Sequence, residues 1–134
     1  GSGLPGIVLA IIMKHNKNSM KFNLYEKSFR KSQFLNEVIK KFNLNAEVFQ
    51  KNIFDEENLN TDILVARAFK PLPTILELAN SNFRNFSSII LFLGKSGMDT
   101  LSGCLKKWDF EYKQKQSLTN PESKIIKIYK FKKK

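Results

Sequence analysis

The order of apolar and polar positions along the chain predicts alternating helices and strands. Residues 7–13 are apolar at nearly every position, which predicts a helix over residues 5–14 that is buried against a sheet. A second helix is predicted over residues 28–42. The apolar residues expected to share one face of it at helical spacing are Phe34, Leu35, Val38, Ile39 and Phe42. The remaining predicted helices span residues 72–80 and 98–107.

The predicted strands lie between these helices and after the last of them. They span residues 20–25, 46–50, 61–66, 88–93, 110–118 and 123–131. The runs at 61–66 and 88–93 are continuously apolar, which is typical of parallel strands buried on both faces. We predict polar loops over 55–60 and 82–87 and a hairpin turn over 119–122. The pattern therefore predicts an α/β fold, a doubly wound and mostly parallel sheet with a C-terminal antiparallel hairpin, in one domain over residues 1–134.

The charge favours a polyanionic partner such as nucleic acid, because the net charge is +11 at pH 7. Three of the 23 basic residues are arginine (Arg30, Arg67 and Arg84), which leaves 20 lysines. An A/T-rich genome would also enrich lysine, so charge alone is weak evidence.

The lone cysteine, Cys104, excludes an internal disulfide and a multi-cysteine metal site, and indicates a reducing, cytoplasmic setting. No apolar run approaches the roughly 20 residues of a membrane span.

The first six residues combine three glycines with a proline in front of the first helix. Glycine lets the backbone come close to a ligand, and proline suits the first turn of a helix. This pattern is typical of a loop that cradles a nucleotide-like ligand, although a plain helix-entry turn has the same composition. Such a turn normally follows a strand, so we expect the first strand of the sheet to precede this sequence.

Polar residues follow the predicted strands at the ends where α/β sheets bind ligands. Glu26 lies 20 residues after Gly6, the spacing of an acid that accepts hydrogen bonds from both ribose hydroxyls. The alternative is a carboxylate favoured by the dipole of the following helix. Asn52 and Ile53 follow the next strand, where an amide can contact adenine while an apolar side chain packs on its ring. A simple polar loop is the alternative there.

Two basic residues follow the apolar strands. Arg67 can hold a phosphate or stack on a base, or it can form a surface ion pair with the acids of 55–57. Lys95 lies in a Gly-Lys-Ser sequence that resembles the end of a P-loop, but Ile89 stands where the first glycine of that motif would fall. His15 and Cys104 lie in unrelated places, so no Ser/His/Asp or Cys/His arrangement can be assembled and hydrolase chemistry of that kind is excluded.

Three segments together resemble the family of small-subunit rRNA methyltransferase G, also called glucose-inhibited division protein B. Residues 1–10 match its glycine loop and apolar helix, residues 26–38 match an acid followed by a basic, Phe-Leu-containing helix, and residues 66–72 match its Arg-Ala-Phe segment. The resemblance covers nearly the whole chain. It implies a Rossmann-like methyltransferase fold that uses S-adenosyl-L-methionine, needs no metal, and methylates the N7 of a guanine in 16S rRNA of the small ribosomal subunit.

The resemblance also implies roles for individual residues. Residues Gly1, Gly3, Leu4 and Gly6 would approach the methionine part of the cofactor, Glu26 the ribose, and Asn52 and Ile53 the adenine. The residues expected to face the RNA as catalytic groups are Arg67, which would also contact the cofactor, and Lys95. Lysines of the C-terminal third would attract phosphates generally.

The chain departs from the family pattern in two ways. The family has an N-terminal helical region and a first strand that this sequence lacks, so we expect a fragment with a gap beside the 20–25 and 61–66 strands. Leu93-Gly94 stands where the family carries Lys-Gly, and Lys95 follows it. Two alternative functions stay open: a basic RNA-binding module without catalysis, and a small-molecule methyltransferase of the same fold. We expect a cytoplasmic monomer that binds neither membrane nor metal.

Overall fold

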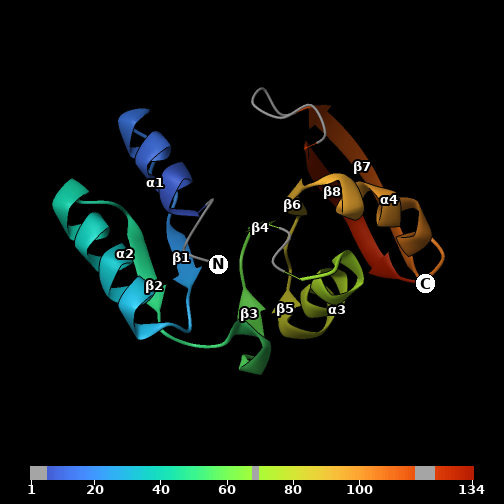
Figure 1. Cartoon of the computed structure of the whole chain (residues 1–134), viewed down its shortest axis with the longest axis horizontal. Helices are drawn as coiled ribbons and strands as arrows, with labels where there is room; N and C mark the ends of the chain where they lie inside the picture. The colour runs from blue at the N-terminus through green and yellow to red at the C-terminus, as the bar shows by residue number, and fades with distance from the viewer. Residues whose placement is uncertain (1–5, 68–69, 117–122) are drawn as a thin grey trace. The chain divides into compact units, whose positions relative to one another are not determined.

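The computed structural model describes residues 6–67, 70–116 and 123–134, which group into two compact units, Gly1–Glu56 and Glu57–Lys134 (Figure 1). The helices and strands of the first unit are α1 (Gly6–His15), β1 (Phe22–Tyr25), α2 (Phe29–Phe42) and β2 (Ala46–Phe49), followed by a short 3-10 turn, η1 (Ile53–Asp55). Strands β1 and β2 pair in parallel, and their last residues, Tyr25 and Phe49, lie opposite each other. These elements agree with the predicted ones to within two residues at each end.

The second unit contains a four-stranded sheet and two helices. Its elements are β3 (Leu59–Asn60), β4 (Ile63–Arg67), α3 (Leu72–Asn82), β5 (Phe83–Arg84), β6 (Ser88–Leu93), α4 (Lys95–Cys104), β7 (Trp108–Gln116) and β8 (Lys124–Lys133). The strand order is β4-β6-β8-β7, with β4 and β6 parallel and the hairpin β7-β8 antiparallel. The predicted α/β class with a C-terminal antiparallel hairpin is confirmed.

Three local predictions were wrong. The predicted loops contain the two-residue strands β3 and β5, which pair with each other and are too short to leave a periodic pattern. Helix α4 begins at Lys95 and not at residue 98. Gly97 lies in the first turn of this helix, where a Cβ would lie 3.1 Å from Leu93 Cδ2. The glycine therefore serves close packing of the helix against the end of β6.

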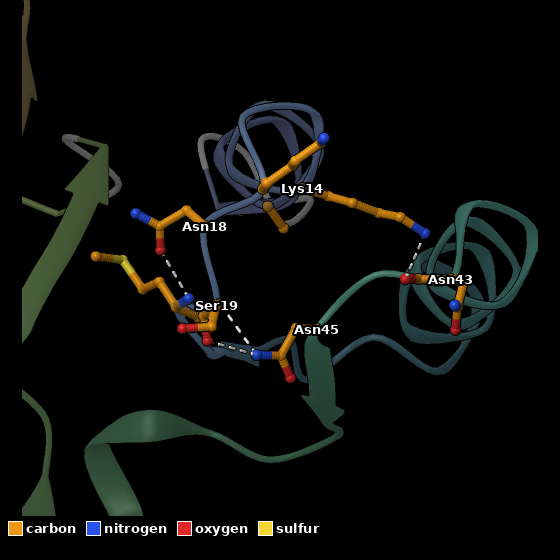
Figure 2. Close-up of a pocket in the computed structure, with 8 residues that line it drawn as sticks. Lys14, Asn18, Ser19, Asn43 and Asn45 are labelled. Atoms are coloured by element: carbon orange, nitrogen blue, oxygen red, sulfur yellow. Dashed lines mark hydrogen bonds between the residues drawn. The ribbon is translucent and has the colours of Figure 1, made fainter.

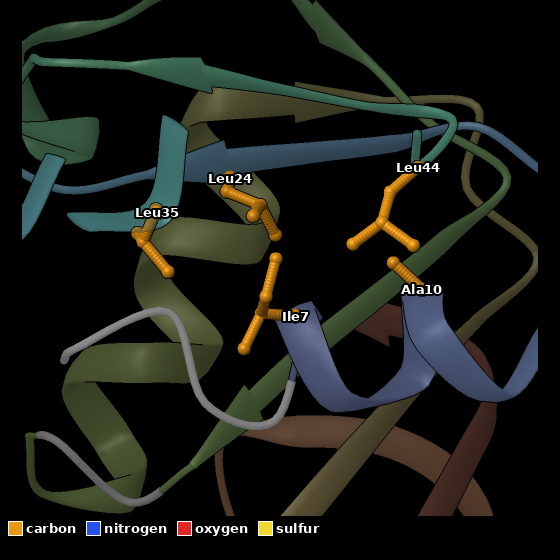
Figure 3. Packing of buried hydrophobic residues seen from close by; sticks show 5 residues of the cluster. All are labelled: Ile7, Ala10, Leu24, Leu35 and Leu44. Atoms are coloured by element: carbon orange, nitrogen blue, oxygen red, sulfur yellow. The ribbon is translucent and has the colours of Figure 1, made fainter. Parts of the chain in front are cut away.

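The core of the first unit lies between the two helices and the β1-β2 pair. Figure 3 shows its five central side chains, Ile7, Ala10, Leu24, Leu35 and Leu44. The first helix was predicted to be buried against a sheet, and its Ile7 and Ala10 are buried in the core with Leu24, whereas Val8, Ile11 and Ile12 on its other side are 37–45% exposed. A helix packed on one side buries one stripe, whatever the composition of the other.

The predicted buried face of α2 was also partly wrong. Phe34 and Phe42 are 59% and 48% exposed, whereas Leu35 and Ser32 are buried. Ser32 can be buried because its hydroxyl donates a hydrogen bond to the backbone oxygen of Glu26 at 2.9 Å. The buried stripe of α2 thus includes a polar residue with a local acceptor, while two phenylalanines predicted to share the buried face are exposed.

One face of the four-stranded sheet forms the core of the second unit. Register places Leu64, Ile89 and Ile128 in one row across the strands, and Ala66, Leu91 and Ile126 in the next; all six are buried. The intervening residues point to the other face, where Ile63 and Val65 are only half-buried. The prediction of burial on both faces was therefore wrong for β4 in the described part of the chain.

The strands on either side of the expected gap were predicted to lack a normal bridge between them. Among the described residues, β1 pairs with β2 alone and β4 pairs with β6 alone, in separate sheets. No described strand pairs with both β1 and β4, and the expectation of a missing strand between them stays a prediction.

Lys14 joins the two helices of the first unit through the end of α2. Its ammonium donates to the backbone oxygens of Phe42 at 2.6 Å and Asn43 at 2.9 Å, at the wall of a polar depression (Figure 2). These carbonyls belong to the C-terminal end of the helix, which has no partners for them within the helix. A lysine from another helix thus satisfies them and complements the negative end of the helix dipole.

We expect Gly6→Ala to destabilise the chain. An added Cβ would lie 2.5 Å from Leu24 Cδ2, which is buried in the core, and such overpacking costs about 1–3 kcal/mol. Gly103 in α4 is the matched control, because nothing lies within 4 Å of its added Cβ, and Gly103→Ala should stabilise the helix by up to about 1 kcal/mol. Thermal unfolding followed by circular dichroism measures both. Equal shifts in the two variants would contradict the packing role of Gly6.

Lys14→Met should lower the free energy of unfolding by about 1 kcal/mol, because two carbonyls at the helix end lose a charged donor. Lys17→Met is the control, because Lys17 lines the same depression and its ammonium, unlike that of Lys14, donates no hydrogen bond to a backbone oxygen among the described residues. Urea denaturation of both variants tests the difference. A control variant that loses as much stability as Lys14→Met would show that the cap contributes nothing specific.

Candidate functional site

The carboxyl edge of the first unit brings together the predicted ribose and adenine residues. Because β1 and β2 run in parallel, Glu26 after β1 and the loop after β2 leave the sheet at the same edge. The backbone N–H of Glu26 donates to the oxygen of Phe49 at 3.1 Å, and its own carbonyl accepts from Ser32 Oγ. Glu26 is therefore held between the neighbouring strand and the first turns of α2.

Burial distinguishes Glu26 from the other acids of its unit. It is 6% exposed, whereas Glu37 and Glu47 are exposed and Glu56 is half-buried. A buried carboxylate is costly unless hydrogen-bond donors surround it, so this position suits an acid with a bound partner. The helix that follows is capped separately by Ser28, whose hydroxyl accepts from the N–H of Lys31 at 3.3 Å. Glu26 is thus not needed as the cap, which weakens the alternative of a purely local helix charge.

The loop after β2 is shaped by Asn52. Its side-chain oxygen accepts a hydrogen bond from the N–H of Phe54 at 3.1 Å, which begins the short η1 turn. That oxygen keeps a second lone pair, and the amide nitrogen offers two donors, so Asn52 can still bind a ligand. Asn52 is exposed and Ile53 is half-buried.

A stacked pair that the sequence analysis missed lies beside this loop. Tyr25 and Phe49 end the two paired strands, and their ring centroids are 5.1 Å apart with 18° between the planes. They lie on the sheet face opposite Leu24, and this alternation was the signal that could have found them. Burial raises the pKa of Tyr25, and the Glu56 carboxylate raises it further. The phenol therefore remains a neutral hydroxyl well into the alkaline range.

The second unit places the two predicted catalytic cations at one edge of its own sheet. Arg67 is the last residue of β4, opposite Phe92 of the parallel strand β6, and Lys95 follows β6 as the first residue of α4. Both side chains are exposed, and neither forms an ion pair in the described part of the chain. The free N–H groups at the start of α4 add to the positive potential of this edge.

Several predicted residues lie outside the described ones. These are Gly1, Gly3 and Leu4 of the glycine turn and residues 68–69 of the Arg-Ala-Phe segment. Gly6 begins α1, where its missing side chain allows the close approach to Leu24. Cys104 is buried at the end of α4, and burial raises the pKa of its thiol, as expected of a small apolar helix residue.

The described residues contain no group of three or more His, Cys, Asp and Glu side chains that could hold a metal ion. Nor is any described helix both long and apolar enough to cross a membrane.

Solved structures share this fold. The 23S rRNA methyltransferase ErmE superimposes with a TM-score of 0.65 over 96% of this chain and 57% of its own, at 15% identity. TrmK of M. capricolum, determined in complex with S-adenosyl-homocysteine, gives 0.63 over 91% of this chain and 57% of its own, at 17% identity. At these identities the likeness shows the fold alone, which is that of the methyltransferases.

Sequence comparison identifies closer relatives. Ribosomal RNA small subunit methyltransferase G of Pelagibacter ubique is 46% identical over 134 residues, which is 100% of this chain and 63% of that protein. The protein of the same name from Caulobacter vibrioides is 33% identical over 96% of this chain and 58% of its own length. The chain thus spans about three fifths of the relatives that it matches. The family described as rRNA small subunit methyltransferase G matches residues 1–128, so the chain belongs to that family.

Proposed function

We propose that this chain carries the methyl-transfer core of a cytoplasmic, monomeric enzyme that uses S-adenosyl-L-methionine to methylate the N7 of a guanine in 16S rRNA. The observation that carries the proposal is Glu26, a buried acid at the carboxyl end of β1 in a chain that belongs to this family. We infer the substrate from the names of the relatives and from the resemblance of the motifs to that family. A net charge of +11 supports an RNA partner.

The residues at the first unit's edge fit the nucleoside part of the cofactor. Glu26 offers a carboxylate that can accept from two vicinal hydroxyls, and the loop beside it offers the amide of Asn52 and the apolar side chain of Ile53. The stacked ring pair of Tyr25 and Phe49 stiffens the strand ends from which both segments leave. When bound, the cofactor supplies a methyl group already activated on a sulfonium.

The chain's own contribution is to bind and orient. Guanine N7 has a lone pair and no proton to remove, so no general base is needed. This suits an edge whose exposed catalytic candidates, Arg67 and Lys95, are both cations. In our proposal the guanidinium N–H groups of Arg67 donate hydrogen bonds to guanine O6 or to a neighbouring phosphate. These bonds orient the base. Holding two reactants in the right geometry can itself lower a reaction barrier by about 7–11 kcal/mol.

Binding of S-adenosylhomocysteine to Glu26→Gln tests the proposal. Loss of charge-assisted hydrogen bonds to the ribose should weaken binding at least about tenfold, since such bonds are worth about 1.5–3 kcal/mol. Glu37→Gln is the matched control, because Glu37 is an exposed acid of the same unit. Isothermal titration calorimetry measures both, with circular dichroism to verify that each variant is folded.

Three outcomes count against the proposal. A folded chain that binds no S-adenosylhomocysteine but binds RNA would favour the RNA-binding module. Equal weakening by the two substitutions would remove the role of Glu26. Cofactor binding without salt-sensitive RNA binding would favour a small-molecule methyltransferase.

A further inference from the structure

The C-terminal hairpin carries three exposed lysines that lie together on one face of the sheet. Residue pairing across β7 and β8 places Lys113 directly opposite Lys127, and Lys115 opposite Ile125. Side chains of paired residues project from the same face of a sheet, and successive residues alternate. Lys113, Lys115 and Lys127 therefore share one face, and all three are exposed.

This face is the one that carries Arg67. The register runs from Arg67 on β4 through Phe92 and Ile125 to Lys115 on β7, so these four residues form one row across the sheet. The next row contains Val65, Ile90, Lys127 and Lys113. With about 4.8 Å between strands, the lysines begin about 10–15 Å from Arg67 on the same surface. The opposite face of the sheet is the buried one.

These three lysines lack the carboxylate partners that others on the hairpin have. Lys130 lies 3.5 Å from Glu111, and Lys132 lies 3.7 Å from Asp109. Among the described residues no ion pair involves Lys113, Lys115 or Lys127. In the described part of the chain, the ammonium of Lys113 lies over the ring of Tyr129, 5.8 Å from its centroid.

The direct opposition of Lys113 and Lys127 costs stability in the free protein. Directly opposite side chains have Cβ atoms about 4.5–5.5 Å apart, and like charges at that distance repel. An anion placed between the two ammonium groups attracts both of them, so the net electrostatic energy of the group becomes favourable. A nucleic-acid backbone carries one negative charge on each successive phosphate. Such a row of charges can pair with the ammonium groups of Lys113 and Lys127 and with that of Lys115 beside them.

We infer that Lys113, Lys115 and Lys127 form a phosphate-binding track for the RNA backbone, on the sheet face that ends at Arg67. The inference rests on the proposed function and extends it, because it assigns the path of the RNA substrate to one surface. Lys130 and Lys132 lie outside the track, because carboxylates already neutralise them. The track binds phosphates and positions the RNA, while base recognition belongs to other groups.

The salt dependence of RNA binding tests the track. The probe is a fluorescently labelled fragment of 16S rRNA, titrated with this chain at several KCl concentrations. For the double variant Lys113→Gln/Lys127→Gln we expect the slope of log K against log[KCl] to become shallower by about 1.4–1.8, since each phosphate contact contributes about 0.7–0.9. The control Lys130→Gln/Lys132→Gln removes the same net charge and should leave the slope nearly unchanged. The variant Lys113→Arg/Lys127→Arg should retain the steep slope.

The same preparations distinguish this inference from the proposed function. Because the glutamine pair relieves repulsion, its melting temperature at low salt should equal or exceed that of the unaltered chain. Equal changes of slope in the track and control variants would overturn the track and indicate a diffuse charge effect. Absence of RNA binding at every salt concentration would overturn it as well. Retained binding of S-adenosylhomocysteine in either case would leave the cofactor half of the proposed function standing.

Discussion

The parallel register of neighbouring strands is the constraint on which the candidate residues of each unit depend. Because β1 ends beside β2, the acid after one strand and the Asn52 loop after the other leave the sheet together. Because β4 ends beside β6, Arg67 and Lys95 do the same in the second unit. A one-residue slip in either pair would send every side chain of the strand to the opposite face and would bury or expose the wrong residues. Leu24 and Leu64, buried in the two cores, hold these registers.

The positions of the lysines say more about RNA binding than their number does. A lysine-rich chain can reflect genome bias as readily as selection for RNA binding. Five lysines of the described part are neutralised locally by carboxylates, namely Lys21, Lys51, Lys107, Lys130 and Lys132. Genome bias alone does not specify that two lysines stand directly opposite each other on the face of Arg67, beside lysines of the same hairpin that carboxylates pair. The arrangement is better explained by a ligand that neutralises them.

The fold class, the hairpin and most element bounds could be predicted from the sequence, because helical and strand periodicities differ and the apolar runs are long. The errors came where tertiary contacts override local pattern. Ser32 is buried because a backbone oxygen accepts from its hydroxyl, whereas Phe34 is exposed, and the start of α4 includes Gly97, whose missing side chain leaves room for Leu93. The positions of Glu26, Asn52 and Arg67 after the strands could be predicted, because the ends of the apolar runs mark where the strands end. The Tyr25–Phe49 stack and the lysine track could not, since both depend on register between strands.

The chemistry proposed for this family member explains why its candidate site contains so few acid–base groups. Methylation at a nitrogen that carries no proton demands orientation and not proton transfer, so a buried acid for the cofactor and cations for the RNA are sufficient. The single histidine ends α1, and the single cysteine is buried in α4, so neither lies at a strand end. A site of this kind gains its rate from how well the base is held. The surface that holds the RNA backbone then matters as much as the residues at the reacting atoms, which is why the lysines that share a face with Arg67 belong to the same functional argument as Arg67 itself.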